Sequence, residues 1–283
     1  MNQPSLTIDG VHVPRFIYGT AWKEDDTQRL VELAIEQGFR GIDTANQRRH
    51  YHEAAVGKAI SASIDRERVG RDELFLQSKY TFERGQDHRL PYDPEAPIPI
   101  QVEQSLASSL EHLSTDHLDS FLLHGPQHSQ GLTSEDWAAW RAMEAIHDSG
   151  RARIIGVSNV TLDQLRCLVE ESRIRPRVVQ NRCYAVLGWD RHVREFCAAN
   201  GIVYQAFSLL TANRNTLASP ELAQIAKHKD RTASQIVFRF AIDIGMVPLT
   251  GTTNTDHMRQ DLDVFDFKLG EEEVERIEGL ELS

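Results

Sequence analysis

Short apolar runs alternate along the chain with longer segments in which apolar residues recur at the three- and four-residue spacing of a helix. The runs end near Gly19, Asp43, Lys79, His124, Gly156, Gln180, Phe207 and Leu249. Consecutive ends lie about 24 to 45 residues apart, which is enough chain for one helical crossover to a parallel neighbour. The pattern therefore predicts eight parallel strands alternating with helices.

Two architectures contain such an alternation, a closed (β/α)8 barrel and an open doubly wound sheet. An open dinucleotide-binding sheet is expected to carry Gly-x-Gly-x-x-Gly after its first strand. The first strand here is followed by YGTAWKEDD, which contains a single glycine. We therefore predict an α/β fold with one (β/α)8 TIM barrel domain over residues 1–283.

Local signals add detail to this barrel. Alternating apolar residues on both sides of Asp9-Gly10 predict an N-terminal β-hairpin over residues 5–14. Residues 83–99 hold four prolines and no periodicity, so we expect a long loop on the catalytic face, where it is a candidate to cover a substrate. Helical spacing and capping signals predict helices over 27–37, 100–113 and 232–244, and one beginning after Thr161.

Composition narrows the range of partners. The chain carries 31 Lys and Arg against 42 Asp and Glu, a formal net charge of −11, so we expect neither a nucleic-acid nor an anionic-membrane partner. No basic-apolar leader and no apolar run of about 18 residues is visible, and we expect a cytoplasmic protein. The chain has three cysteines, Cys167, Cys183 and Cys197, which we expect to be small buried hydrophobes rather than disulfides or zinc ligands.

Ionisable residues stand where three successive strands end. Asp43 ends the second predicted strand, Lys79 the third and His124 the fourth. Because the carboxyl ends of barrel strands meet at one mouth, these side chains are predicted to converge there. Taken singly, an Asp-Lys pair or a histidine is also compatible with a structural role.

These strand ends lie in GFRGIDTA (38–45), LFLQSKY (74–80) and DSFLLHGP (119–126). Together with Tyr51 in the next loop, they resemble the Asp, Tyr, Lys and His tetrad of the aldo-keto reductase family. The resemblance extends in family order over nearly the whole chain, through EAAVGKAI (53–60), GVSN (156–159), VVQN (178–181), YQAFSLL (204–210) and PLTGTTNTDHMRQDL (248–262).

The resemblance implies an NAD(P)H-dependent enzyme that reduces an aldehyde or ketone to an alcohol. Tyr51 would donate the proton, with its pKa lowered by Lys79, while Asp43 keeps Lys79 charged and His124 orients the carbonyl oxygen. The spacing departs from the family pattern at this point. The residue five positions after Asp43 is Arg48, and the Tyr-x-x-Glu count back from Glu53 ends on His50. We assign the role to Tyr51, because a two- or three-residue insertion reconciles the counts.

Cofactor contacts also follow from the resemblance. Ser158, Asn159 and Gln180 match the residues that bind the nicotinamide carboxamide, although Ser158-Asn159 is also compatible with a helix N-cap. Phe207 stands where an aromatic residue stacks on the nicotinamide ring. Further expected cofactor contacts are Gly19, Thr20, Asp43, Ser208, Leu210, Gly251, Thr252, Thr253, His257, Arg259 and Asp261.

The phosphate end departs from the family as well. This chain has Gly251-Thr252 where family members usually have Lys-Ser, so the resemblance leaves the preference for NADPH over NADH open. We expect NADPH, with Arg259 or His257 meeting the extra phosphate and NADH as the alternative. Thr252, Thr253 and Asn254 offer further hydrogen bonds to phosphate at a helix N-terminus.

The substrate is expected to be a small-molecule carbonyl compound in an apolar mouth. Its contacts would be Tyr51 and His124 with the aromatic residues Trp22, Tyr80, Tyr184 and Trp189, each of which is equally compatible with a loop aromatic. We expect no metal, and the oligomeric state stays open, with a monomer plausible.

Two alternatives remain. One is a catalytically silent nucleotide-binding regulatory subunit on the same fold. The other is a metal-dependent barrel hydrolase that uses imidazoles among His50, His52, His88, His124 and His128.

Overall fold

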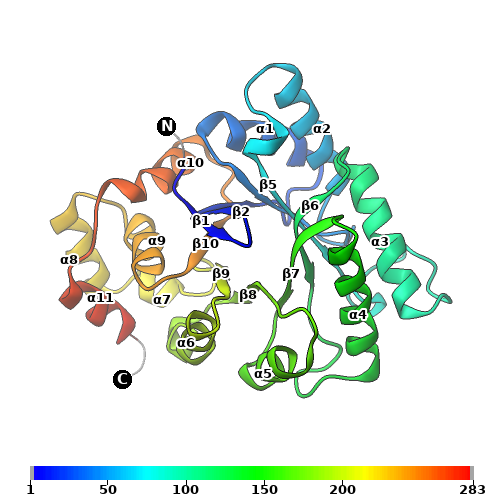
Figure 1. Ribbon diagram of the computed structural model, residues 1–283. Coiled ribbons are helices and arrows are strands. Elements are labelled where there is room, and N and C mark those ends of the chain that lie inside the picture. Colours follow the sequence, from blue (N-terminus) through cyan, green and yellow to red (C-terminus); the bar gives the residue numbers. More distant parts are fainter. Residues whose placement is uncertain (1–2, 281–283) are drawn as a thin grey trace.

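In the computed structural model, which describes residues 3–280, eight parallel strands close into a barrel in the order β10-β3-β4-β5-β6-β7-β8-β9 (Figure 1). This confirms the predicted barrel. The strands are β3 (Ile17–Gly19), β4 (Gly41–Asp43), β5 (Phe75–Tyr80), β6 (Leu118–Leu123), β7 (Ala152–Ser158), β8 (Val178–Arg182), β9 (Val203–Phe207) and β10 (Val247–Thr250).

Helices surround the barrel and follow most of the predicted patterns (Figure 1). In α1, the predicted apolar stripe is buried and the helix ends at Gly38, whose φ of 111° favours glycine. The helices are α1 (Thr27–Gln37), α2 (Glu53–Asp65), α3 (Ile98–Leu113), α4 (Ser134–Asp148), α5 (Leu162–Glu171), α6 (Arg191–Ala199), α7 (Arg214–Leu217), α8 (Pro220–Lys229), α9 (Ala233–Asp243), α10 (Thr255–Leu262) and α11 (Glu271–Glu278).

The predicted N-terminal hairpin is also present. Strands β1 (Ser5–Ile8) and β2 (Val11–Pro14) pair antiparallel around Asp9 and Gly10, which both have positive φ. Val11 and Val13 pack against inward-facing residues of the barrel strands, including Ile17 and Phe75. The hairpin therefore covers the amino-terminal end of the barrel, opposite the strand ends that carry the predicted site.

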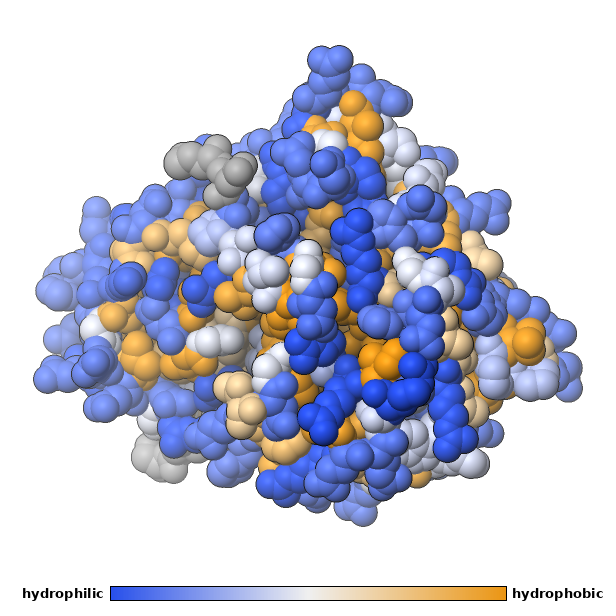
Figure 2. Space-filling model, in the orientation of Figure 1, coloured by the Kyte–Doolittle hydropathy of each residue, from blue (hydrophilic) through white to orange (hydrophobic). Residues whose placement is uncertain are grey.

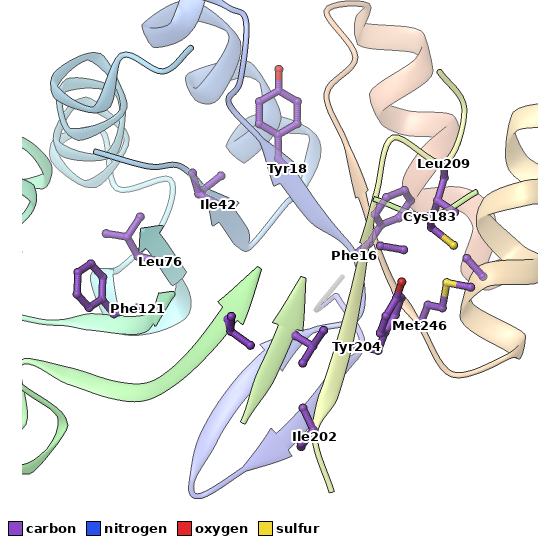
Figure 3. Packing of buried hydrophobic residues seen from close by; sticks show 14 of the residues in the cluster. Phe16, Tyr18, Ile42, Leu76, Phe121, Cys183, Ile202, Tyr204, Leu209 and Met246 are labelled. Carbon is purple, nitrogen blue, oxygen red and sulfur yellow. The ribbon is translucent and has the colours of Figure 1, made fainter. Parts of the chain in front are cut away.

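The larger core lies between the barrel and its helices. Figure 3 shows members of this layer, among them Ile42, Leu76 and Phe121 from three successive strands. Figure 2 shows hydrophilic residues over most of the periphery of the hairpin face. Within the described residues, no helix is long and apolar enough to span a bilayer.

Strand alternation decides which side chains face the barrel interior. In β5, Lys79 points inward and the neighbouring Tyr80 points outward, where its ring packs on Phe82 and Tyr92. The predicted loop 83–99 is shorter than expected, because a 3-10 turn occupies Glu83–Gly85 and α3 begins at Ile98.

Candidate active site

A cavity of about 1,210 Å³ opens among the carboxyl ends of the strands. Its wall contains most of the residues that the sequence singles out. They are Gly19, Trp22, Asp43, Tyr51, His124, Ser158, Asn159, Gln180, Phe207, Ser208, Leu210, Gly251, Thr252, His257 and Asp261.

The charged pair at its base is fully buried. Lys79 Nζ donates to Asp43 Oδ1 at 2.6 Å and to the carbonyl oxygen of Thr44 at 2.9 Å. The two side chains are 0% and 3% exposed, so neither charge is solvated except by its partners. Burial lowers the pKa of Lys79, and the Asp43 carboxylate opposes that shift.

Two rings from different loops flank this pair. Lys79 Nζ lies 5.4 Å from the centroid of the Tyr51 ring, and the rings of Tyr51 and His124 meet edge to face at 6.0 Å. The structure therefore brings all four residues of the predicted tetrad together. Burial, followed by the Asp43 charge, raises the pKa of Tyr51, so the expected lowering by Lys79 is not the net effect.

His124 is held through one ring nitrogen. Its Nδ1 lies 2.6 Å from the hydroxyl of Thr81, a residue that sequence reasoning missed. Burial lowers the pKa of His124 to about 3, with Lys79 and His50 adding to the effect, so the imidazole is neutral near neutral pH.

The departure from the family spacing also has a structural explanation. His50 stacks on Trp22, with ring centroids 3.9 Å apart, while the next residue, Tyr51, lies beside Lys79. The backbone N–H of Trp22 donates to the carbonyl of His50 at 2.7 Å. The longer loop therefore places Tyr51, rather than His50, next to the cation.

The long loop after β5 braces this segment instead of standing free over the cavity. Gln86 Nε2 donates to the carbonyl of Asn46 at 2.9 Å, and Arg89 Nη2 donates to that of Arg48 at 3.1 Å. From the other side, Gln47 Nε2 donates to the carbonyl of Gly85 at 2.5 Å. These bonds fix the chain that leads to Tyr51.

A layer of three glutamines lies beneath the tetrad, and sequence reasoning missed two of them. Gln77 and Gln180 donate to the same Asp43 oxygen, Oδ1, at 2.7 and 3.0 Å. Both also donate to Gln205 Oε1 at 2.8 Å. Because an ionised carboxylate only accepts hydrogen bonds, it requires both amide nitrogens to face it. Gln77 was discoverable, since it lies two residues before Lys79 on the same strand face.

The residues that we expect to contact the nicotinamide also line the cavity. Ser158 Oγ donates to the carbonyl of Gln180 at 2.6 Å, and Asn159 Nδ2 donates to that of His124 at 2.8 Å. The N-cap interpretation of Ser158-Asn159 is wrong, because Thr161 caps α5 and accepts from the backbone of Gln164. Gln180 uses its amide N–H groups inside the protein and leaves Oε1 as the group available at the cavity wall.

At the phosphate end, one of the two expected basic residues does not line the cavity, and another basic residue does. Arg259 is paired with Asp256 at 2.7 Å and does not line the cavity, whereas His257 does. Lys23, which sequence reasoning missed, lines the cavity and donates to the carbonyl of Gly251. A Cβ added at Gly251 would lie 3.4 Å from Lys23 Nζ.

Besides Arg259 and Asn254, five expected contacts lie outside the cavity wall. Tyr80 is 0% exposed and donates its hydroxyl to Gln101, and Trp189 is 0% exposed with Nε1 directed to the carbonyl of Ile277. Strand alternation and core packing explain these two corrections. Thr20 is buried and donates to the carbonyl of Asp43, and neither Tyr184 nor Thr253 lines the cavity.

Cysteines and potential metal ligands add no second site. Cys183 and Cys197 are buried as expected, whereas Cys167 is partly exposed on α5, which corrects that expectation. Within residues 3–280, no three His, Cys, Asp or Glu side chains are grouped so that they could hold a metal ion.

Comparisons with known proteins give a consistent result. The model of the Aldo/keto reductase family matches residues 16–281. "Aldo-keto reductase MT3049" of Mycobacterium tuberculosis is 31% identical, over 98% of this chain and 91% of its own. The crystal structure of an aldo/keto reductase from Brucella melitensis superposes with a TM-score of 0.84 at 27% identity, covering 99% and 100% of the two chains. A Bombyx mori aldo-keto reductase, solved in complex with NADP, gives 0.83 at 28% identity, covering 98% and 92%.

Proposed function

The chain belongs to the aldo/keto reductase family and is an NAD(P)H-dependent oxidoreductase, and we propose that its single barrel domain reduces an aldehyde or ketone with Tyr51 as proton donor. The observation that carries the proposal is the position of Lys79 Nζ, which bonds Asp43 at 2.6 Å and lies 5.4 Å from the Tyr51 ring centroid. A buried cation at this distance stabilises negative charge that develops on the phenol as its proton leaves.

The protonation states at the site are compatible with a tyrosine donor. Burial raises the pKa of Tyr51, so the phenol carries its proton near neutral pH, and Lys79 is the group placed to stabilise the charge that forms when that proton leaves. The neutral His124 has Nδ1 paired with Thr81. If the hydroxyl of Thr81 donates, Nε2 carries the proton and donates to the carbonyl oxygen of the substrate, which orients it toward Tyr51.

A nicotinamide dinucleotide fits the donor set of this cavity and supplies the hydride that carbonyl reduction requires. Gln180 offers a carbonyl oxygen, which suits the N–H groups of a carboxamide, and Phe207 offers an apolar ring beside it. Ser158 and Asn159 complete that end of the cavity. Ser208 and Leu210 follow β9, between the two ends.

NADPH is the proposed cofactor because basic side chains stand at the other end. Lys23 and His257 line the cavity there. The solved Bombyx mori relative was crystallised with NADP, which supports the same choice. Lys23 takes the place of Arg259 in this proposal, since Arg259 is already paired with Asp256.

The test is NADPH oxidation, followed at the cofactor's near-ultraviolet absorbance, with a panel of neutral aldehydes and ketones. Multiple turnovers are expected with NADPH, and fewer with NADH at equal concentration. Binding of both nucleotides without turnover of any carbonyl would favour the silent-subunit alternative. Equal use of NADH would contradict the cofactor proposal while leaving carbonyl reduction intact.

A further inference from the structure

Three cations line the cavity without a carboxylate partner anywhere in the described part of the chain: Lys23, Arg84 and Arg182. This is unusual for a protein with a formal net charge of −11, in which many arginines are ion-paired. The cavity therefore attracts anions. The phosphates of a bound dinucleotide would pair with those cations that lie near them.

Arg84 does not lie at the phosphate end. In the barrel order β10-β3-β4-β5-β6-β7-β8-β9, β5 stands three strands away from β10. Arg84 follows β5, whereas Gly251 and His257 follow β10. A cofactor whose phosphates lie beside Gly251 and His257 therefore does not account for Arg84.

Arg84 is instead close to the proposed carbonyl-binding residues. Its Nη2 donates to the carbonyl oxygen of Pro126, two residues after His124. The guanidinium is therefore anchored on the short segment that follows His124 and, like His124, lines the cavity. Gly85, the next residue, is bonded to Gln47 of the loop that carries Tyr51.

The wall around Arg84 carries polar groups from Gln47, His128 and Ser129 beside the apolar Phe82 and Pro126. Of the aromatic residues expected at the mouth, only Trp22 and Tyr51 line the cavity. Gln47 Oε1 is buried without a hydrogen-bond partner. None of the carboxylates that line the cavity, Asp43 and Asp261, belongs to this part of the wall.

We infer that Arg84 selects small carbonyl substrates that carry a carboxylate. Only one of the five guanidinium donors is used within the described residues, and the remaining fork matches a planar carboxylate. This inference rests on the proposed carbonyl reduction and names its substrate class.

The test compares 4-formylbenzoate with its methyl ester, which has the same ring and the same aldehyde but no charge. With NADPH, the wild-type protein is expected to show a kcat/KM about 5- to 10-fold higher for the acid, because Arg84 is exposed and its ion pair is partly screened. In Arg84→Met this ratio should fall to about one, with the ester's kcat/KM nearly unchanged. Arg84→Lys should retain part of the preference.

Arg141→Met is the matched control. Arg141 is an exposed arginine of α4 that does not line this cavity, so the preference for the acid should persist. A wild-type protein that reduces acid and ester equally, or a preference that survives Arg84→Met, would overturn the inference and leave carbonyl reduction standing.

A binding measurement separates the two proposals. Benzoate added to the protein with NADP⁺ should quench the fluorescence of Trp22, which is 69% exposed at the cavity, and Arg84→Met should weaken that binding about 5-fold or more. If neither aldehyde is reduced but benzoate binding depends on Arg84, the proposed reaction fails and the carboxylate site stands. Binding that is unaffected in Arg84→Met contradicts the site itself.

Discussion

The part of the mouth formed by β4, β5 and β6 and the part formed by β10 and α10 differ in how their charges are partnered. In the first, Asp43 and Lys79 are almost completely buried and bonded to each other and to amides. In the second, Arg259 and Asp256 form an exposed pair, and Lys23 has only a backbone carbonyl as partner. The first part is therefore a fixed electrostatic environment suited to the proposed proton transfer. The second part has basic groups that can complete their interactions with a ligand.

In both parts, contacts from a neighbouring element support the segment that carries the site. The loop after β5 and the ring of Trp22 hold the segment that leads to Tyr51. At the phosphate end, the ammonium group of Lys23 lies beside the position that a side chain at Gly251 would occupy.

The largest effect is expected from Tyr51→Phe. Removing the proton donor should lower kcat for carbonyl reduction about 10²- to 10⁴-fold, while NADPH binding is retained. His50→Phe is the matched control, because His50 stacks on Trp22 and not on Lys79, and it should retain most of the activity. If the two variants lose activity in the opposite order, His50 rather than Tyr51 is the functional residue of this loop.

A smaller loss is expected from Gln77→Met, which tests whether the buried pair depends on its amides. Gln77 donates to Asp43 and so stabilises the ionised Asp43–Lys79 pair against a neutral pair formed by proton transfer. We expect kcat to fall about 10-fold, with the Kd for NADPH nearly unchanged.

Ser120→Ala is the control for this layer, because Ser120 pairs with Gln77 across β5 and β6 but has an unpartnered hydroxyl. Its kcat should equal that of the wild type. An equal loss in both variants would mean that the effect is one of packing, and not of the charge on Asp43.

At the other end of the cavity, Lys23→Met and Arg259→Ala sharpen the comparison. Lys23→Met should weaken NADPH binding about 10-fold in a fluorescence titration, because a partly desolvated cation is lost. Arg259→Ala should leave it nearly unchanged, since that guanidinium is exposed and already paired. The reverse result would return the phosphate contact to Arg259.

The smallest effect concerns stability and involves Asp261. Burial raises the pKa of this carboxyl to about 7, so the folded state holds a proton that the unfolded state releases near pH 4. The stability that this proton contributes is fully present below about pH 4 and is lost as the pH rises through about 7. Asp261→Asn should therefore gain about 1 kcal/mol relative to the wild type between about pH 6 and pH 8, measured by urea unfolding. A constant difference across that range would contradict the shift.

The apolar pattern by itself determined the barrel, the hairpin and the location of Asp43, Lys79 and His124 at or next to the ends of successive strands. These features are local or periodic, because a strand that ends in Asp43, Lys79 or His124 must present that residue at the mouth of a parallel barrel. The capping box at Thr161 was similarly local, since its bonds join residues three apart.

Tertiary structure alone decided which side chains share the cavity. Tyr80 lies one residue from Lys79 yet faces the helices, while Arg84 and Lys23 reach the site from loops after β5 and β3 and Gln205 from within β9. It also decided the protonation of the site, because burial, rather than the identity of the residue, raises the pKa of Tyr51 and lowers that of His124. Burial and hydrogen-bond partners arise from contacts between distant segments, and a local sequence pattern does not encode those contacts.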